Sequence, residues 1–488
     1  MSARVPWALA VALALAAACG DDDGGGGDPG GAADARPTEP DAAGDPDAEP
    51  GFVCERSDDD LLVRLEAIPS VASVVEEDIG EPYRFFRIEF EQPVDHASPG
   101  GATFRQRITL LHRDLEAPMV LHTTGYYGVG GPFAAEPTAL LDANQIDTEQ
   151  RFFLPSRPDP ADWRLLTIEQ AAADHHRIVA ALRPIYCAKW VSTGASKGGM
   201  TSVYHRRFYP NDVDATVAYV APISFGAPDD RYHPFFDTVA TAGCRTALRS
   251  FQTELLERRA AMLTRMQNYA EQSGITFDRL SGTEGAFEDA IIEFPWGFWQ
   301  YGSPSDCASI PPTTATDAAL FSFLRDSGGL YFFGDDTIVT YSPYYYQAWT
   351  QLGYPSAPTA HIADLLETQA LPRDYMPDGV EPTYQPAAMQ DVDQWVRGEA
   401  ERILFVYGEF DPWYAGHFEL GDAEDSLLLV APGANHGAGI SDLEAADRET
   451  ATAALRRWMG VAALAPAAQR AASALPGPPP PPRLRLGR

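Results

Sequence analysis

Basic residues are scarce in this chain of 488 residues, which has 36 Lys and Arg against 69 Asp and Glu and a formal charge of −33. A surface this acidic repels the phosphate backbone of a nucleic acid and offers no basic stripe that could follow it. We therefore exclude nucleic acids as the expected partner. Hydrophobic residues make up 45% and charged residues 22% of the chain, which is typical of a globular protein.

Motifs for metals and cofactors are also missing. The 5 cysteines include no C-x-x-C pair, and the 10 histidines include no H-E-x-x-H or comparable spacing. His175 and His176 have apolar neighbours in an expected helix, which favours structural or surface roles. We expect no cofactor and no metal.

Long hydrophobic runs are absent except at the start of the chain, in residues 1–19. Arg4 and the apolar stretch 5–18 have the character of an export signal, and the stretch is too short for a comfortable membrane span. Cys19 resembles the lipidated cysteine of a bacterial lipoprotein, although Leu15 stands one position earlier than usual. We expect a cell-envelope protein whose only membrane contact is a lipid anchor at Cys19, with soluble secretion as the alternative.

Two further segments lack any apolar face. Residues 20–52 consist mainly of Gly, Asp, Ala and Pro, and we expect an acidic, flexible tether there. Residues 463–488 include a proline run that forms neither helix nor sheet, so we expect a loose tail. The folded part is therefore expected within 53–462.

Cysteine is rare, and an even number remains after Cys19, namely Cys54, Cys187, Cys244 and Cys307. In an exported protein this number indicates two disulfides, for which three pairings exist. We favour Cys244–Cys307 with Cys54–Cys187, because the first pair brackets one inserted segment. Four unpaired, buried thiols are the alternative.

Strand-like and helix-like segments alternate through much of the folded part. The expected strands are 83–93, 103–112, 118–125, 188–193, 215–222, 402–408 and 426–432. Among the expected helices, 167–182 has a capping box of Thr167 and Gln170, and the last helix opens with a second box at Ser441 and Glu444. Strands alternating with helices predict an α/β fold with a mainly parallel sheet covered on both faces.

The alternation stops over residues 223–398, which contain helical patches and aromatic clusters. We expect this stretch to form a large, mostly helical cap inserted into the sheet domain. The sheet domain would then consist of 53–222 and 399–462.

A nucleophile motif lies between an expected strand and an expected helix, in the run T-G-A-S-K-G-G. Ser196 is the serine of G-x-S-x-G, and Gly194 and Gly198 lack side chains where the backbone must pass closely. This is the nucleophile turn of the α/β-hydrolase fold. The N–H of Lys197, at the start of the following helix, is expected to face an oxyanion. An incidental serine in a glycine-rich loop is the alternative.

A serine hydroxyl needs a base and an acid, which this fold supplies in the chain order Ser, acid, His. His436 follows the last expected strand in a loop that can reach Ser196, and it is the predicted base; His417 is expected on the surface or facing the cap. Asp411, in the loop after 402–408, is the predicted acid that orients the imidazole. Glu409 is its alternative.

The second oxyanion donor is expected in the loop that follows residues 118–124. In this fold a backbone N–H of that loop completes the oxyanion hole. The residues at that position are Gly125 and Tyr126.

Several runs together carry a resemblance to a known family, namely QPVDH (92–96), FRQRITLLHRD (104–114), RFFLPSRPDPADW (151–163), STGASKGGM (192–200) and YGEFDPW (407–413). They resemble the S37 family of secreted serine peptidases, the PS-10 type of tripeptidyl aminopeptidase. The chain is also similar, more distantly, to the prolyl carboxypeptidase and dipeptidyl peptidase II group. The resemblance implies that Ser196, Asp411 and His436 are the triad. It further implies an exopeptidase that releases short peptides, tripeptides above all, from free N-termini.

Residues for substrate binding are less clearly indicated. Gln150 stands where the family resemblance leads us to expect Tyr or His, whereas the neighbouring Glu149 could pair with the α-ammonium group of a substrate. A structural ion pair between Glu149 and Arg151 is the alternative. Aromatic and amide side chains of the expected cap could line subsites, with a place in the core as the alternative; they are Trp296, Trp299, Tyr345, Tyr346, Gln347 and Trp349.

Two other functions stay open from the sequence alone. A capped esterase or lipase would use the same triad, because the triad does not distinguish esters from amides. A non-catalytic binding protein on a hydrolase scaffold is the other alternative, and the intact Ser, Asp and His argue against it. The sequence does not indicate an oligomeric state.

Overall fold

A computed structural model describes residues 54–128, 130–368 and 370–462 of the chain. The chain divides into two units, 1–51 and 52–488, and the described residues all belong to the second. The predicted export signal, the lipidated Cys19, the tether 20–52 and the tail 463–488 lie outside the described residues.

Nine strands of the described residues form one sheet in the order β1-β2-β3-β5-β4-β6-β7-β8-β9. They are β1 Val71–Glu77, β2 Arg84–Pro93, β3 Thr103–His112, β4 Met119–Thr123, β5 Asn144–Thr148, β6 Trp190–Ala195, β7 Ala215–Tyr219, β8 Ile403–Gly408 and β9 Leu427–Ala431. The pairs β1–β2, β2–β3 and β3–β5 are antiparallel, and the other pairs are parallel. The predicted mainly parallel sheet is confirmed.

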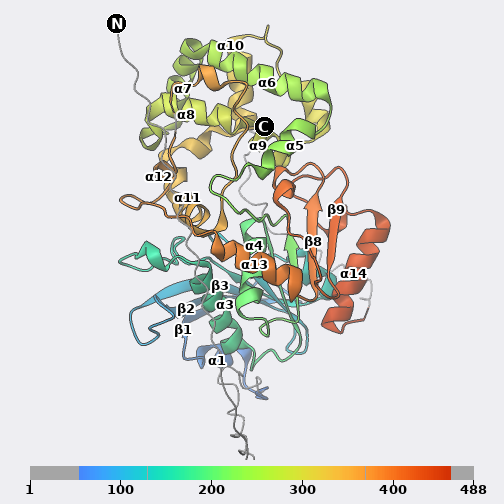
Figure 1. The fold of residues 1–488 in the computed structure, drawn as a ribbon. Coiled ribbons are helices and arrows are strands. Elements are labelled where there is room, and N and C mark those ends of the chain that lie inside the picture. The colour runs from blue at the N-terminus through green and yellow to red at the C-terminus, as the bar shows by residue number, and fades with distance from the viewer. Residues whose placement is uncertain (1–53, 129, 369, 463–488) are drawn as a thin grey trace, which may run out of the picture. The chain divides into compact units, whose positions relative to one another are not determined.

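Helices cover both faces of this sheet (Figure 1). They are α1 Leu61–Glu66, α2 Glu136–Leu141, α3 Ile168–Leu182, α4 Lys197–Phe208, α13 Ala387–Gly398 and α14 Ala445–Met459. Val217 on β7 belongs to an apolar cluster with α14, whereas its neighbour Ala218 belongs to a cluster with α3, α4 and α13. Because successive strand residues point to opposite faces, the two clusters are the two sides of the sheet. This arrangement is the predicted α/β-hydrolase fold.

The two predicted capping boxes have different outcomes. Thr167 caps α3 as expected, since its side chain accepts a hydrogen bond from the N–H of Gln170. The box at Ser441 is wrong, because Ser441 lies in a 3₁₀ turn, Ile440–Asp442, and α14 begins after Glu444. The N–H of Ser441 instead donates to the carboxylate of Glu136 at 2.8 Å, which ties this turn to α2.

Eight helices of the described residues between β7 and β8 are called the cap helices here. They are α5 His233–Thr238, α6 Ala242–Glu257, α7 Arg259–Ser273, α8 Gly282–Ile292, α9 Phe294–Tyr301, α10 Asp317–Gly328, α11 Asp335–Gln347 and α12 Pro372–Tyr375. Most of them share an apolar core of their own, and α6, α7, α8 and α10 occupy the top of Figure 1. Within the range predicted for the cap, α13 packs against the sheet through Met389 and Val392.

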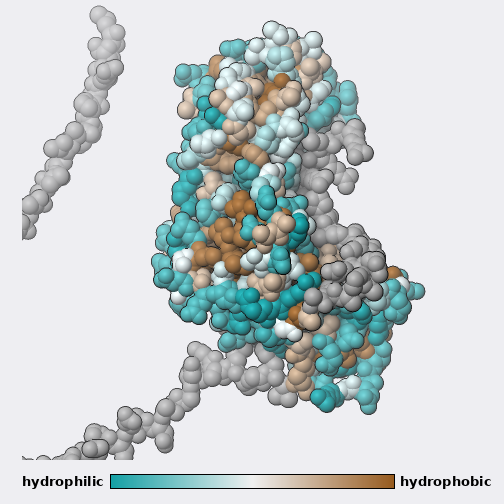
Figure 2. Space-filling model, turned by 90° about the vertical axis from the view of Figure 1, so that its right-hand side faces the viewer, coloured by the Kyte–Doolittle hydropathy of each residue, from teal (hydrophilic) through white to brown (hydrophobic). Residues whose placement is uncertain are grey.

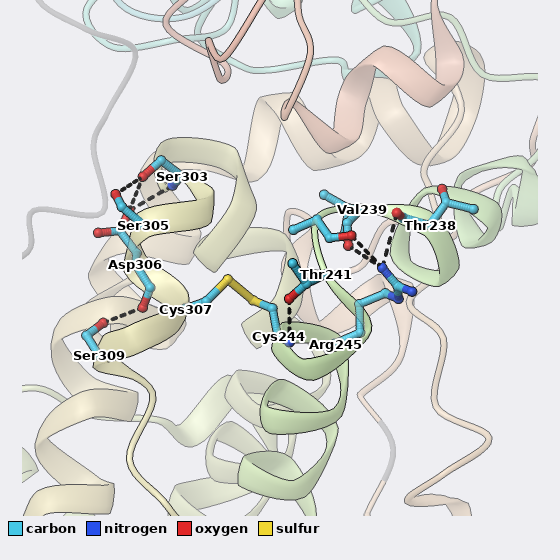
Figure 3. Close-up of a disulfide and its surroundings, with 11 residues drawn as sticks. Thr238, Val239, Thr241, Cys244, Arg245, Ser303, Ser305, Asp306, Cys307 and Ser309 are labelled. Atoms are coloured by element: carbon cyan, nitrogen blue, oxygen red, sulfur yellow. Dashed lines mark hydrogen bonds between the residues drawn. A yellow bond between two sulfur atoms is a disulfide. The ribbon is translucent and has the colours of Figure 1, made fainter.

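Two disulfides connect the cysteines of the described residues. Cys244 on α6 is bonded to Cys307 in the 3₁₀ turn Pro304–Ser309, as Figure 3 shows, and Cys54 is bonded to Cys187. Thr241 caps α6 by accepting from the N–H of Cys244. These bonds fit the favoured pairing.

The surface is mostly polar, with a local exception. Figure 2 shows a face on which brown hydrophobic surface gathers at mid-height, between areas covered mainly by teal and pale residues. None of the helices in the described ranges is both long enough and apolar enough to span a membrane.

Candidate active site

Ser196 lies in a strained turn between β6 and α4, with φ +57° and ψ −125°. A Cβ on Gly194 would lie 2.4 Å from the carbonyl of Gly198, and a Cβ on Gly198 would lie 2.3 Å from the oxygen of Thr123. Both contacts are shorter than atoms tolerate, so the two glycines are required by the close approach of the backbone. The turn raises the Ser196 side chain to the carboxyl edge of the sheet, at the start of a helix.

His436 and Asp411 are joined by a hydrogen bond of 2.7 Å between Nδ1 and Oδ2. Both side chains are fully buried, and the other carboxylate oxygen of Asp411 accepts from the N–H of Trp413. The two alternatives lie elsewhere, because Glu409 accepts from the N–H of Gly433 and His417 bonds to the carbonyl of Tyr414. An imidazole held in this way keeps its proton on Nδ1 and leaves Nε2 as an acceptor.

The Nε2 atom of His436 is buried and has no hydrogen-bond partner within the described ranges. The rings of Tyr301 and Trp413 flank the imidazole, each with its centroid 6.1 Å away. The hydroxyl of Tyr126 lies near Ser196; burial raises the pKa of Tyr126, and the Ser196 side chain acts against that rise. A buried, unpaired acceptor is unfavourable unless a donor reaches it during function.

The loop of His436 is attached to cap helix α9. The N–H of His436 donates to the carbonyl of Gln300 at 3.0 Å, and the side-chain amide of Asn435 donates to the carbonyl of Gly302 at 3.2 Å. On the sheet side, a Cβ on Gly408 would lie 2.2 Å from the oxygen of Asn435. The position of the imidazole therefore depends on the sheet and on a cap helix together.

The backbone oxyanion donor predicted at Tyr126 has a partner in the structure. The N–H of Tyr126 donates to the side-chain oxygen of Thr124 at 3.2 Å. The hydroxyl of this residue is the group that lies near Ser196. Lys197 is the first residue of α4, so its N–H has no partner within the helix. Gly125 packs against this helix start, since a Cβ there would lie 2.6 Å from the nitrogen of Gly198.

The side chain of Lys197 is buried beneath the same loop. Its ammonium nitrogen donates to the carbonyl of Gly125 at 2.5 Å and lies 5.6 Å and 5.7 Å from the ring centroids of Tyr126 and Phe153. No carboxylate pairs with it among the described residues, and burial lowers the pKa of Lys197 to about 7. The side chain of Lys197 therefore joins the loop after β4 to the start of α4, directly after Ser196.

A cavity of about 910 Å³ opens above Ser196 and is called the Ser196 cavity here. Its walls come from the sheet edge and from cap helices α8, α9 and α11. Of the predicted substrate-binding side chains, Trp296, Tyr345 and Trp349 line the cavity. A volume of this size is within the range of sites that enclose small ligands.

The other predicted substrate-binding side chains are not part of the cavity wall. Trp299 is fully buried and stacks on Phe410, and Tyr346 packs against Trp163. Gln347 is also fully buried, and neither atom of its amide has a hydrogen-bond partner within the described ranges.

Glu149 is not part of the cavity wall either. It is fully buried under the loop after β4, where it pairs with Arg107 and accepts from the N–H of Gly128 at 2.8 Å. The alternative ion pair with Arg151 is also wrong, because Arg151 binds Asp174. Glu149 therefore stabilises the loop and is not exposed to a substrate.

Two carboxyl groups that the sequence analysis missed do line the Ser196 cavity, namely Asp289 on α8 and Glu293 directly after it. Burial raises the pKa of Asp289 to about 6 and that of Glu293 to about 8. The available signal was their spacing of four residues, which places both on one side of a helix within an apolar segment. Within 54–462, residues 129 and 369 aside, no three His, Cys, Asp or Glu are placed to hold a metal ion.

Comparisons with known proteins relate this chain to a peptidase family. Residues 54–477 match the family model described as PS-10 peptidase S37. The chain is 44% identical over 409 residues to a prolyl tri/tetrapeptidyl aminopeptidase of Streptomyces mobaraensis, covering 83% of this chain and 86% of the relative.

Solved structures with some similarity include a proline iminopeptidase of Mycobacterium smegmatis, with 13% identity, a TM-score of 0.34, and coverage of 76% of this chain and 98% of that one. Another is a peroxisomal alpha-beta-hydrolase of Saccharomyces cerevisiae, with 13% identity, a TM-score of 0.36, and coverage of 79% and 92%. By its match over most of its length, this chain belongs to the S37 family of peptidases.

Proposed function

We propose that this serine peptidase is an exopeptidase that releases short peptides, tripeptides above all, from free N-termini. The observation that carries the proposal is the buried Asp411–His436 pair at the same sheet edge as Ser196, beside a cavity of about 910 Å³. A relative that is 44% identical bears the name prolyl tri/tetrapeptidyl aminopeptidase, which supports the same substrate class.

The proposed reaction begins when the Ser196 hydroxyl turns toward the unpaired Nε2 of His436. Nε2 takes the proton while the serine oxygen attacks the scissile carbonyl, and Asp411 stabilises the imidazolium through Nδ1. His436 then gives the proton to the leaving amine, and water releases the peptide from the acyl-enzyme by the same route. Hydrogen bonds of this kind often tighten only when substrate is bound.

The tetrahedral intermediate needs two donors for its oxyanion. The proposed donors are the backbone N–H of Lys197 and the hydroxyl of Tyr126, a residue that lines the same cavity as Ser196. A tyrosine hydroxyl can serve in this role, and a donor fixed before the reaction is worth several kcal/mol of transition-state stabilisation, on the order of 3 kcal/mol. The Lys197 side chain positions the loop that carries Tyr126.

The cap helices support the restriction to chain ends. Helices α8, α9 and α11 line the cavity beside Ser196, which would limit the length of chain that fits next to the scissile bond. We also propose that the protein is exported and carries a lipid at Cys19, as the first 19 residues predict.

A panel of chromogenic substrates tests the proposal. Protein without residues 1–19 should cleave X-X-Pro p-nitroanilides with a free amine far faster than the N-acetylated forms or the corresponding dipeptidyl amides. Hydrolysis limited to p-nitrophenyl esters would support an esterase or lipase instead. If the protein hydrolyses none of these substrates, the non-catalytic alternative is supported.

A further inference from the structure

The walls of the Ser196 cavity carry an unusual set of charges. Among its described lining residues, Asp289 and Glu293 are the only carboxyl groups, and the buried Lys197 is the only cation. Lys197 is directed at the carbonyl of Gly125 and does not pair with either acid. Among the described lining residues, the two acids are therefore without a partner cation in a cavity lined by aromatic rings.

Most of the carboxylate oxygens of the two acids accept no hydrogen bond from the described residues. Asp289 is only 8% exposed, and one of its oxygens accepts from the hydroxyl of Tyr375. Its other oxygen and both oxygens of Glu293 make no hydrogen bond within the described ranges. A neighbouring carboxylate of α8, Glu288, is fully occupied by Arg259 and by the backbone of residues 367 and 368, so it is not part of this set.

Aromatic rings surround the acids on the cavity side. Tyr345 lies 4.8 Å from Tyr375 and 6.2 Å from Tyr354, and Trp349 stacks on Tyr354 at 5.4 Å, measured between ring centroids. All four of these rings line the cavity. Faces of tyrosine and tryptophan attract cations, and an enclosure of such rings is a recurrent way to bind an ammonium group. The rings thus point to the same kind of ligand as the unpaired acids do.

We propose that Asp289 and Glu293, within this group of aromatic rings, bind the α-ammonium group of the peptide whose carbonyl is attacked by Ser196. The inference rests on the proposed function, and it assigns the recognition of the free N-terminus to residues of the cap. A substrate ammonium supplies the missing positive charge, and the hydroxyl of Tyr375 holds Asp289 in place to receive it. Since both acids are on or next to α8, the spacing between that helix and Ser196 limits how many residues are released in one cut.

The placement of the two acids is unfavourable by itself, because burying an unpaired carboxylate costs free energy. Burial, and to a smaller extent Asp289, raises the pKa of Glu293, and the two acids add to the rise that burial causes in the pKa of Tyr345 and Tyr354. Such a cost is expected where a ligand of opposite charge removes it on binding.

The test compares Ala-Ala-Pro p-nitroanilide with its N-acetylated form in four proteins: the wild type, Asp289→Asn, Glu293→Gln and the control Glu284→Gln. Glu284 lies on the same helix, is 46% exposed in its side chain and does not line the cavity. We expect each cavity variant to reduce kcat/KM for the free amine by about 30-fold or more and to leave the slow cleavage of the acetylated form unchanged. The control should behave as the wild type does.

Hydrolysis of p-nitrophenyl acetate reports whether each variant retains its catalytic centre, and Tyr375→Phe, which keeps the ring, gives a milder version of the same loss. Retention of the preference for the free amine in both cavity variants would overturn this inference alone. A wild type that cleaves both substrates equally would overturn the exopeptidase proposal and, with it, this inference.

Discussion

The backbone N–H of His436 donates a hydrogen bond of 3.0 Å to the carbonyl of Gln300, the penultimate residue of cap helix α9. The proposed catalytic base is thereby held by a helix that also contributes to the wall of the Ser196 cavity. If helix α9 shifts, this hydrogen bond should shift the His436 loop with it. The shape of the Ser196 cavity and the position of the proposed base are therefore expected to be coupled.

This coupling predicts the effect of a small change at Gly302, just after α9. A Cβ there would lie 2.3 Å from the carbonyl of Phe298, and the end of the helix must shift to make room. Because Asn435 is bonded to the Gly302 carbonyl, the His436 loop should move with it. We expect Gly302→Ala to lower kcat by about 10- to 100-fold with a smaller effect on KM, measured by steady-state kinetics.

The matched control is Gly243→Ala in α6, where the nearest atom to the added methyl group is 3.8 Å away. It should leave kcat as in the wild type. If Gly302→Ala folds and keeps the kcat of the wild type, the helix does not position the base.

The assignment of the second oxyanion donor predicts the outcome at Tyr126. Tyr126→Phe keeps the ring and the Thr124 hydrogen bond to the backbone but removes the hydroxyl that lies near Ser196. We expect kcat for the amide substrates to fall by about 10²- to 10³-fold while KM stays close to its wild-type value. An unchanged kcat would return the role to a backbone N–H such as that of Gly125.

The buried amine of Lys197 is expected to lower the stability of the protein while its hydrogen bond supports activity. Its pKa is lowered to about 7, so the folded protein must hold a buried charge below that pH, and stability falls as the pH drops from about 10.5 toward 7. Lys197→Met removes the charge together with the hydrogen bond to Gly125. We expect its Tm, relative to the wild type, to rise by roughly 2–4 °C at pH 6 and to lose this gain near pH 10, while kcat falls at both.

Thermal unfolding followed by circular dichroism at the two pH values measures this difference. A Tm advantage that does not depend on pH would mean that the buried amine is not the source of the instability.

Glu293 predicts the opposite pH dependence. Its folded pKa is raised to about 8, so the ionised form destabilises the fold, and stability is lost as the pH rises from about 4.5 through 8. Facing groups are Asp289 on α8, Tyr344 and Tyr345 on α11, and Tyr354 after it, none of them a cation. We expect Glu293→Gln to raise the Tm by roughly 2–4 °C at pH 9 and to have no effect near pH 4.5. Differential scanning fluorimetry in the absence of substrate is the measurement, and a larger gain at low pH would contradict the account.

The turn at Ser196 and the pairing of Asp411 with His436 could be predicted because their signals are local or follow from chain order. Gly194 and Gly198 indicate the close backbone approach that the structure shows. The loop after β8 contains few carboxyl groups that could be the acid. By contrast, β5 gave no strand signal, since its sequence NQIDT is mostly polar. Its side chains are nevertheless buried, because Gln145 bonds to the backbone of Ala135 and Asp147 bonds to His122.

The residues that failed as predictions depend on contacts between distant parts of the chain. Glu149 is occupied by Arg107 on β3, 42 positions earlier, and no local pattern reveals that pair. The proposed role of Asp289 and Glu293 depends on rings of α11 and α12 and on a cavity that forms only when the cap helices pack together. Hydropathy and motif spacing carry information about local structure, whereas the lining of an enclosed site depends on tertiary packing.

The most direct test of the central claim is covalent labelling with a fluorophosphonate, followed by mass spectrometry of the peptides. The account predicts one adduct, on Ser196, that forms readily in the wild type, is strongly slowed in His436→Ala and Asp411→Asn, and is absent in Ser196→Ala. An adduct on another residue, or labelling of Ser196 at the same rate in the His436 variant as in the wild type, would contradict it.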